Sequence, residues 1–399
     1  MAPGRDRISQ LPTDILDHIL GLLPIKNAAK TAVLSSIWRG AWSSLTQLNF
    51  DDDFFCHIDR KYHRVKKSNK EYAPSLYVIN KVLLQHNGTI RKLILNFSNV
   101  GKLTYRYRSF DFDQWLLLVT KKGVEEMYIG VNEKAYKLPS CIFSCLTLKR
   151  LHMYGVIIGP VDLPRILPNV DSLCFEHVDF GPKNLLRRAV DVPVLENLSF
   201  LSCQNIFYFN LTAPKLCGLT IKCCSSNVPD KFLPVNLDLK SFLTLELEGS
   251  LQEFGKEFTK LGFQLNVEYL KLSCFSHKSD VRTSAFVNLL QLCPKLCKLE
   301  INLSQLEVVT MGCVDAWLEV LEKLHSAAQI NKMLQTLKVT SFSGSKTQIL
   351  FIRKLLASFS TLKKVIIVHM HYGLKEENRI TKELLHFHGT SIKAEIIFV

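Results

Sequence analysis

The cysteines are the side chains in this chain with the widest range of chemistry. There are 12 of them, a number that raises the question of a zinc site or a disulfide framework. No Cys-x-x-Cys pair occurs, and the tightest spacings are Cys141/Cys145, Cys293/Cys297 and the adjacent Cys223-Cys224. We therefore expect free thiols that pack as small apolar side chains, and no metal site.

The histidines and the lack of catalytic motifs also argue against a metal site or an active site. His369 and His371 flank Met370, and His386 and His388 flank Phe387. Alternate histidines on a strand can bind a metal, but they are more often exposed strand residues. The sequence has no Gly-rich phosphate loop, no Gly-x-Ser-x-Gly elbow and no His-Glu-x-x-His helix. We predict no catalytic residue, no cofactor and no enzyme activity.

The composition is that of a globular protein with several units. The 399 residues are 47% hydrophobic and 22% charged. The longest apolar runs, such as 115–119 and 365–368, are far shorter than the roughly 18 residues of a membrane span. The first ten residues contain no apolar signal segment. We expect a protein of the nucleus, the cytoplasm or both, with no membrane partner.

The formal net charge is +14, and its densest part is a basic cluster at residues 60–70, which follows Asp51-Asp52-Asp53 after residues 54–59. The cluster lacks apolar periodicity, which predicts a surface loop. A nuclear-import or phosphate-binding role for it is one hypothesis. The remaining positive charge is dispersed along the chain.

Three short helices are predicted near the start. Pro12 favours a first helix, which ends at Pro24 and leaves only Asp14, Asp17, His18 and Gly21 for solvent. A second helix is predicted from about Asn27, a good cap residue, to Leu34. A third carries Trp38 and Trp42 on one face.

These helices carry more apolar surface than so small a module can bury. Ile15, Leu16, Ile19, Leu20, Leu22 and Leu23 form two adjacent stripes. A unit of about 40 residues is also normally too small to be stable alone. The surplus surface therefore predicts a protein partner.

The order of these residues resembles an F-box, in the variant typical of plant F-box proteins with leucine-rich repeats. The pattern is Leu11-Pro12-x-Asp14-Ile15-Leu16, then Leu23-Pro24, Val33-Leu34-Ser35 and Trp38-Arg39. The resemblance implies a three-helix module that binds the Skp-type adaptor of a cullin-based (SCF) ubiquitin ligase. It implies these adaptor-binding residues: Leu11, Pro12, Ile15, Leu16, Val33, Leu34 and Trp38, with Trp42 partly in the core.

One departure from the family pattern lies just before Trp38. The family usually has basic residues there, and this chain has Ser36 and Ile37. Charges at the rim of an interface mainly tune the association rate, so their loss would weaken docking.

From residue 86 onward the pattern apolar-x-x-apolar-x-apolar recurs. Eight of the ten intervals between its eleven copies lie between 21 and 29 residues, the period of leucine-rich repeats. Pro214-Lys-Leu-Cys-Gly-Leu-Thr-Ile221 and Pro294-Lys-Leu-Cys-Lys-Leu-Glu-Ile301 differ at only two positions. The copies centre on Leu93, Met127, Leu151, Leu173, Leu198, Leu219, Leu245, Leu270, Leu299, Leu337 and Val365.

Each copy predicts a turn and then a short strand whose last two apolar residues point into a solenoid. Small residues three positions later, Asn132, Cys203 and Cys224, are expected to bond turn backbone. The outward residues would bind the target, and their mixed charge argues against a nucleic-acid reader. They are Glu196, Asn197, Cys217, Gly218, Glu246, Lys271, Cys297, Lys298 and Lys338.

The last part of the chain predicts a helix at 315–333, then a strand, a turn, a helix at 349–356 and another strand. A last helix near 384–387 and a strand near 394–398 follow. This order resembles the FBD module that closes many plant F-box repeat proteins. An atypical terminal unit protects the open edge of a solenoid.

The sequence therefore predicts an α/β protein: a three-helix F-box, an irregular leucine-rich-repeat solenoid and an FBD-like C-terminal cap. The expected divisions are 7–50 for the F-box, 51–85 for a basic linker, 86–330 for the solenoid and 331–399 for the cap. The predicted function is target recognition in an SCF-type ubiquitin ligase, with a Skp-type adaptor, a cullin bound through it and an unidentified target as partners. The alternative is a non-ligase repeat scaffold with a degenerate F-box.

Overall fold

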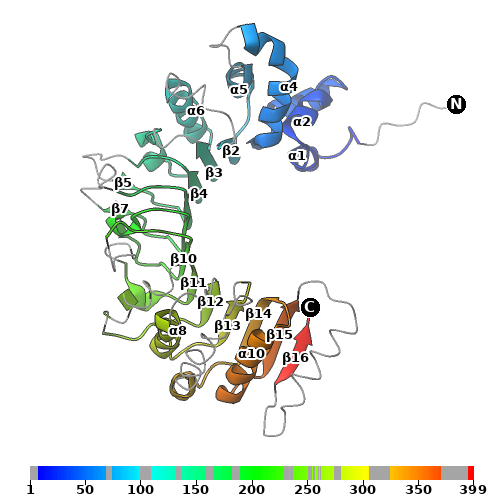
Figure 1. Ribbon diagram of the computed structural model, residues 1–399. Coiled ribbons are helices and arrows are strands. Elements are labelled where there is room, and N and C mark those ends of the chain that lie inside the picture. The colour runs from blue at the N-terminus through cyan, green and yellow to red at the C-terminus, as the bar shows by residue number, and fades with distance from the viewer. Residues whose placement is uncertain are drawn as a thin grey trace, which may run out of the picture. The chain divides into compact units, whose positions relative to one another are not determined.

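The structure is a computed structural model, and its elements are drawn in Figure 1. The described residues are 8–68, 74–98, 109–131, 136–158, 165–181, 189–228, 233, 237–249, 254, 257–258, 260, 262–273, 280–304, 324–369 and 394–399. The chain divides into two compact units. Unit 1 is residues 1–195 with 208–213, and unit 2 is residues 196–207 with 214–399.

Unit 1 begins with three short helices, α1 (Thr13–Gly21), α2 (Ile25–Thr31) and α3 (Ser36–Ser43). Prolines cap α1 and α2, because their missing N–H groups are not needed there. The second helix therefore starts at Ile25, and the predicted start near Asn27 is wrong. Ser35 caps α3 by accepting a hydrogen bond from the Trp38 N–H at 3.4 Å.

A parallel sheet follows in unit 1, in the order β1-β2-β3-β4-β6. Its apolar residues are in register across the strands, as Leu48, Leu93, Met127, Leu151 and Leu173. The strands are β1 (Gln47–Phe50), β2 (Lys92–Phe97), β3 (Glu126–Val131), β4 (Arg150–Tyr154) and β6 (Ser172–Glu176). Three shorter strands form a second sheet: β5 (Arg165–Ile166), β7 (Val190–Asp191) and β9 (Leu211–Thr212).

The basic cluster lies on a helix, so the predicted surface loop is wrong for residues 60–68. Helix α4 (Asp52–Ser68) begins where the Asp51 carboxylate accepts the Phe54 N–H at 3.1 Å, and its first turn is acidic. Phe54, Phe55 and Ile58 give it a buried face at helical spacing. The other helices in the described part of unit 1 are α5 (Pro74–Gln85), α6 (Ser109–Lys121) and the 3-10 helix η1 (Ser140–Ser144).

Aromatic side chains join helices α4 and α6 of unit 1 to its sheet. Phe50 on β1 contacts Phe54 on α4 with ring centroids 5.1 Å apart, and Phe55 contacts Phe97 on β2 at 4.4 Å. Phe97 in turn contacts Phe112 on α6 at 4.6 Å. Such rings bury large areas and prefer these tilted contacts. Helices α4 and α6 therefore share an aromatic core with strands β1 and β2.

Unit 2 contains a parallel sheet in the order β8-β10-β11-β12-β13-β14-β15-β16. Its strands are β8 (Asn197–Leu201), β10 (Gly218–Lys222), β11 (Thr244–Glu248), β12 (Tyr269–Ser273), β13 (Lys298–Asn302), β14 (Thr336–Phe342), β15 (Lys364–His369) and β16 (Glu395–Phe398). Its helices include α8 (Asp280–Leu292), α10 (Lys346–Ser358), η4 (Leu239–Ser241) and most of η3 (Ile206–Tyr208).

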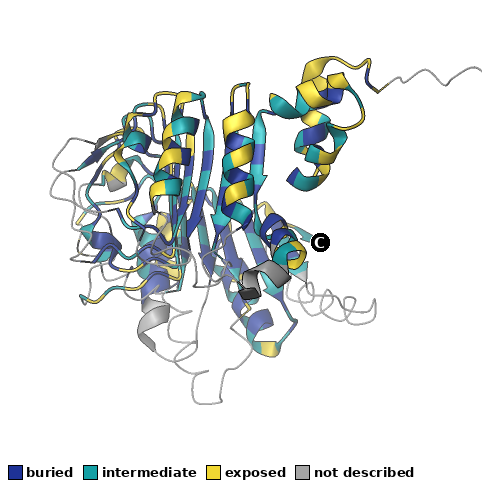
Figure 2. Cartoon of the chain, turned by 90° about the horizontal axis from the view of Figure 1, so that it is seen from above, coloured by how far each residue is buried: buried dark blue, intermediate teal, exposed yellow. Residues whose placement is uncertain are grey.

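The predicted repeat geometry is confirmed in both units. All eleven predicted centres lie on strands, and neighbours such as Leu219, Leu245 and Leu270 are register partners. Buried and half-buried residues alternate along the strands (Figure 2). The first apolar residue of each copy is buried in the preceding turn, as at Leu216 and Leu296. The α/β class predicted from the sequence is therefore confirmed.

Part of the C-terminal prediction is also confirmed. The expected helix at 349–356 is α10, and the expected strands are β14, β15 and β16. Residues 324–330 of the predicted 315–333 helix are helical. Residues 331–333 are not helical, so the predicted helix ends too late. Asn132, residues 315–323, the helix near 384–387 and His371, His386 and His388 lie outside the described residues.

Candidate functional site

The interior of the three-helix module is small and apolar. Leu16, Leu20, Ile25, Ala28 and Trp38 are buried. The Trp38 Nε1–H donates to the Ser9 Oγ at 2.9 Å, so the only polar atom of the indole is satisfied. This core orients the three helices relative to one another.

Asp17 anchors the module to the sheet instead of facing solvent as predicted. Its Oδ1 accepts the Thr46 N–H at 2.7 Å, and its Oδ2 accepts the Thr46 hydroxyl at 2.6 Å. Both bonds involve a carboxylate, which makes them stronger than neutral bonds. They hold helix α1 at the start of strand β1.

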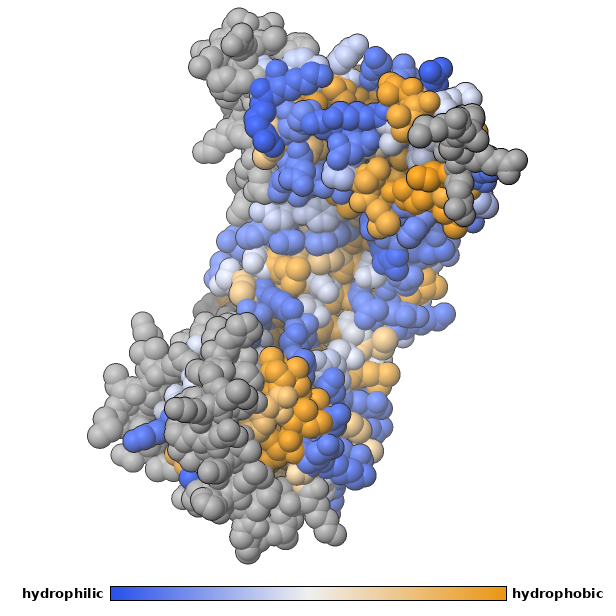
Figure 3. Space-filling model, turned by 90° about the vertical axis from the view of Figure 1, so that its right-hand side faces the viewer, coloured by the Kyte–Doolittle hydropathy of each residue, from blue (hydrophilic) through white to orange (hydrophobic). Residues whose placement is uncertain are grey.

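A set of large apolar side chains on this module remains exposed, and we call it the apolar face. Val33 is 83% exposed and Leu34 is 68% exposed, although monomeric proteins rarely gather such residues without a partner. Figure 3 shows apolar side chains gathered on the part of unit 1 that carries these helices. The apolar face consists of Ile8, Leu11, Ile15, Leu22, Leu23, Val33, Leu34 and Ile37.

The predicted adaptor-binding residues divide between the exposed surface of the module and its core. Five are exposed, namely Leu11, Pro12, Ile15, Val33 and Leu34. The other two, Leu16 and Trp38, are buried among the three helices, and Trp42 is half-buried. In this structure, Leu16 and Trp38 can support the apolar face but do not form its surface.

The two residues that depart from the family pattern lie at the start of α3. Ser36 is exposed, and Ile37 belongs to the apolar face with 48% exposure. The usual basic rim is thus replaced at one position by further apolar surface.

The outward residues of unit 2 form a ladder of alternating charge. Glu246, Lys271, Glu300 and Lys338 are register partners on β11 to β14. Lys271 Nζ lies 2.8 Å from Glu246 Oε1, and Lys338 Nζ lies 3.2 Å from Glu300 Oε1. Lys222 Nζ also lies 2.9 Å from Glu246 Oε1. These charges are largely satisfied within the sheet.

The ladder shifts the ionisation of its members. Burial alone would raise the pKa of Glu246, but hydrogen bonds from Lys271 and Lys222 outweigh it and hold that pKa below its usual value. The bond to Glu246 raises the pKa of Lys271. Burial and a bond to Glu300 raise the pKa of Tyr269, whose hydroxyl lies 2.8 Å from Glu300 Oε2. The shifts of Glu246 and Lys271 keep both groups charged near neutral pH, and the shift of Tyr269 keeps its hydroxyl protonated.

The strand face of unit 1 is different, because its central row is uncharged. Ile94, Tyr128, His152 and Cys174 are register partners on β2 to β6. They line a shallow hollow of about 330 Å³, with Lys92, Glu126 and Arg150 along its rim. Such a mixture of aromatic and polar groups suits contact with a protein segment.

Two side chains in this row have shifted pKa values. Burial raises the pKa of Tyr128 to about 12. Burial also lowers the pKa of His152, although its Nε2 lies 2.9 Å from the Glu176 carboxylate. His152 is therefore mainly neutral near pH 7.

Sequence reasoning missed two features of these surfaces. Glu300 occupies the outward position between Leu299 and Ile301, so strand alternation could have identified it. Strand β1 was also missed, although Leu45-x-x-Leu48-x-Phe50 has the repeat pattern and pairs with β2. Gly218, predicted to be a binding residue, is buried beneath Asn197, whose Oδ1 would lie 2.5 Å from an added Cβ.

The cysteines within the described ranges are free thiols. Cys203 and Cys224 are buried, and their thiols donate to backbone carbonyls of Leu201 and Phe200, both at 3.5 Å. Both carbonyls belong to strand β8, so these thiols bond strand backbone and not the turn backbone that the sequence predicted. Burial raises the pKa of Cys293 to about 12, which keeps it protonated and unreactive.

The geometry defines a class of protein: a small helical module with an exposed apolar face, followed by parallel-strand repeats. Comparison with known families agrees with it. Residues 8–48 match the F-box domain, and residues 82–330 match the family described as At1g61320/AtMIF1, LRR domain. Neither match is to an enzymatic domain.

Relatives in Arabidopsis thaliana have the same domains. The chain is 26% identical to an F-box/FBD/LRR-repeat protein, and the match covers 100% of both chains. It is 33% identical to an F-box/LRR-repeat protein over 66% of this chain and 49% of that one. It is also 28% identical to a putative FBD-associated F-box protein over 54% of this chain and 48% of that one.

The chain belongs to the plant family of F-box/FBD/leucine-rich-repeat proteins. Proteins of this kind are in general non-catalytic adaptors, whose F-box binds a Skp-type protein and whose repeats bind targets. Among the described residues, no helix is long and apolar enough to cross a membrane.

Proposed function

We propose that this chain is the target-recognising subunit of an SCF-type ubiquitin ligase. Its F-box would dock a Skp-type adaptor through the apolar face, and its strand faces would bind the target. The apolar face is the observation that carries the proposal, because a helical module of this size has little other reason to expose Val33 and Leu34.

Burial of this face would contribute favourably to docking. Burying a side chain such as Leu34 contributes about 1.5–3 kcal/mol relative to leaving it in water. Central apolar contacts usually carry most of the binding energy of an interface. Loss of both Val33 and Leu34 is therefore expected to weaken docking by about 100-fold or more.

The proposed role of the repeats is to hold a target, not to act on it chemically. In unit 1, Tyr128 and His152 of the uncharged row would contact the target, and in unit 2 the charge ladder would do so. Holding a target on these faces would raise the effective concentration of its lysines near the transferred ubiquitin.

The first experiment is a binding titration with a purified Skp-type adaptor. It compares the intact chain with Leu11→Ala/Pro12→Ala and with Val33→Asp/Leu34→Asp. All four residues are exposed, so both variants should fold. The matched control is Tyr77→Asp/Leu84→Asp on α5, which changes two exposed apolar residues outside the apolar face.

Saturable binding that both test variants lose and the control keeps is the expected result. No binding by the folded, unaltered chain would remove the ligase proposal. In that case the alternative would stand: a repeat scaffold whose F-box no longer docks an adaptor, which Ser36 and Ile37 favour. The proposal also expects the protein in the nucleus, the cytoplasm or both, which imaging of a fluorescent fusion in plant cells would check.

A further inference from the structure

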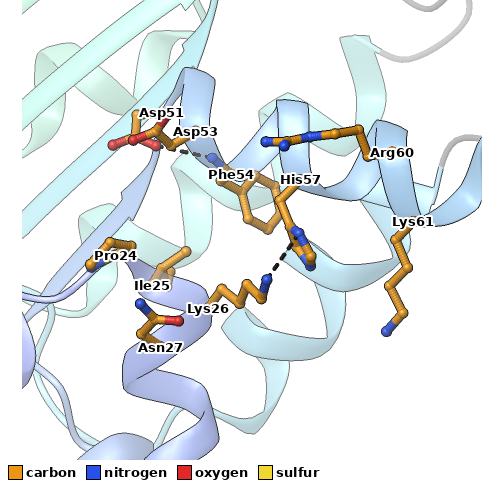
Figure 4. A pocket seen from close by; sticks show the side chains of 10 residues that line it. All are labelled: Pro24, Ile25, Lys26, Asn27, Asp51, Asp53, Phe54, His57, Arg60 and Lys61. Carbon is orange, nitrogen blue, oxygen red and sulfur yellow. Dashed lines mark hydrogen bonds between the residues drawn. The ribbon is translucent and has the colours of Figure 1, made fainter.

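A second surface of unit 1 lies between the start of α2 and the first turns of α4. It is a hollow of about 540 Å³ (Figure 4). We call it the basic hollow, because Lys26, Arg60 and Lys61 line it together with His57. None of these four belongs to the apolar face. The other lining residues are Pro24, Ile25, Asn27, Asp51, Asp53 and Phe54.

The cations of the basic hollow have no acidic partner among the described residues. Lys26 Nζ donates to His57 Nδ1 at 3.1 Å, so its nearest partner is an imidazole. Arg60 uses only its Nε–H, which donates to the Cys56 carbonyl at 3.1 Å. The terminal nitrogens of that guanidinium remain available, and they suit bidentate contact with a phosphate or carboxylate.

The two aspartates at the edge of the hollow do not neutralise these cations. The Asp51 carboxylate accepts the Phe54 N–H at 3.1 Å and the Asn49 Nδ2 at 2.7 Å. Asp53 is exposed and makes no ion pair in the part of the chain that the structure describes. In Figure 4 both lie at the end of the hollow away from Lys26.

The pKa of His57 is lowered, which agrees with a positive environment in the hollow. Burial lowers its pKa, and Lys26, Lys61 and Arg60 lower it further. A neutral His57 keeps Nδ1 free to accept the bond from Lys26. The hollow therefore has an excess of positive charge and an imidazole that a bound anion would help to protonate.

We propose that the basic hollow binds a compact anion that carries phosphate groups, held by Lys26, Arg60 and His57. Its volume lies within the range of small-ligand sites. This role is separate from adaptor docking and does not depend on it.

A small anion fits this surface better than a nucleic acid does. Proteins that bind single strands present exposed aromatic rings on which bases stack. The only aromatic ring lining the hollow besides the imidazole is Phe54, which is 6% exposed and packs on Phe50 and Phe55. The charged groups also surround one hollow and do not form a track.

The test is calorimetric titration of the intact chain with inorganic pyrophosphate. The variant Lys26→Gln/Arg60→Gln removes two charges from the hollow. The control Lys332→Gln/Lys363→Gln removes the same charge from two exposed positions of unit 2. The single variant Arg60→Gln is a second, milder probe, and melting curves check that every variant folds.

Pyrophosphate should bind the unaltered chain and the control equally. Binding should weaken about tenfold or more in Lys26→Gln/Arg60→Gln and to a smaller extent in Arg60→Gln. No binding by the unaltered chain, or equal weakening in the test and control variants, would overturn the proposal. A single-stranded oligonucleotide that binds more tightly than pyrophosphate and displaces it from the hollow would overturn the proposal. The ligand would then be a nucleic acid and not a small anion.

Discussion

At the residue scale, buried polar side chains connect the F-box helices of unit 1 to its repeats. His86 is 5% exposed, and its Nε2–H donates to the Leu45 carbonyl at 2.8 Å. Lys122 Nζ donates to the His86 carbonyl at 2.7 Å. Burial, aided by Lys122, lowers the pKa of His86 despite the opposing effect of the Leu45 carbonyl.

This lowered pKa predicts that the protein loses stability in mild acid. The unfolded chain takes up a proton near the ordinary value of 6.5, whereas folded His86 does so only at lower pH. Below that ordinary value the unfolded state binds more protons, so the free energy of unfolding falls as pH falls. The slope from this residue should approach about 1.4 kcal/mol per pH unit.

The measurement is denaturant unfolding between about pH 7.5 and pH 5.5, the range in which a histidine titrates. His86→Gln, whose amide can still donate to Leu45, should flatten the pH dependence. His325→Gln, at an exposed position, should leave it unchanged. Equal slopes for His86→Gln and the unaltered chain would contradict the prediction.

At the element scale, each strand of unit 2 depends on side chains of its neighbours. Glu300 on β13 is 5% exposed and contacts Tyr269 and Lys271 on β12 and Lys338 on β14. Removing one member of a buried ion pair leaves the other without compensation. Glu300 should therefore contribute to stability far more than an exposed glutamate does.

Glu300→Ala is expected to destabilise unit 2 by about 2–4 kcal/mol, because Lys338 and Tyr269 lose their carboxylate partner and Lys271 loses the second of its two. Hydrogen exchange should show faster exchange of the amides of β12, β13 and β14. Glu196→Ala, at an exposed position, should change stability by less than about 0.5 kcal/mol. A similar small change for both variants would show that the ladder is not stabilising.

At the scale of the whole molecule, the net charge of +14 permits two kinds of partner. Docking through an apolar face should depend weakly on salt, whereas nucleic-acid binding loses affinity steeply because phosphate counterions are released. Binding to a Skp-type adaptor should therefore weaken less than about threefold between roughly 50 and 200 mM salt.

The same salt series with the intact chain and DNA provides the comparison. Any DNA binding should fall by a factor of about 10 or more over that range. Adaptor binding that falls as steeply would indicate that docking is electrostatic, and the apolar face would lose its proposed role. Binding should be followed by the same optical signal in both series. Val33→Asp/Leu34→Asp is the non-binding reference for the adaptor series.

Local patterns along the chain determined the strand centres and most of the F-box helices. Leu219 and Leu245 were identified as strand residues because the spacing of apolar residues can be recognised within a few neighbouring positions. Pro12 marked the start of α1 for the same local reason, whereas α1 ends at Gly21 and Pro24 caps α2. Even the error at α4 was local, since Asp51 and the spacing of Phe54, Phe55 and Ile58 signal a helix that the basic cluster obscured.

Only the tertiary structure decided which of these residues are available to a partner. Leu16 and Val33 have equal places in the family pattern, yet packing of three helices buries one and exposes the other. Glu300 gains its role from residues 31 and 38 positions away. Such contacts depend on strand pairing between distant segments. The residue pattern within a single strand does not predict that pairing.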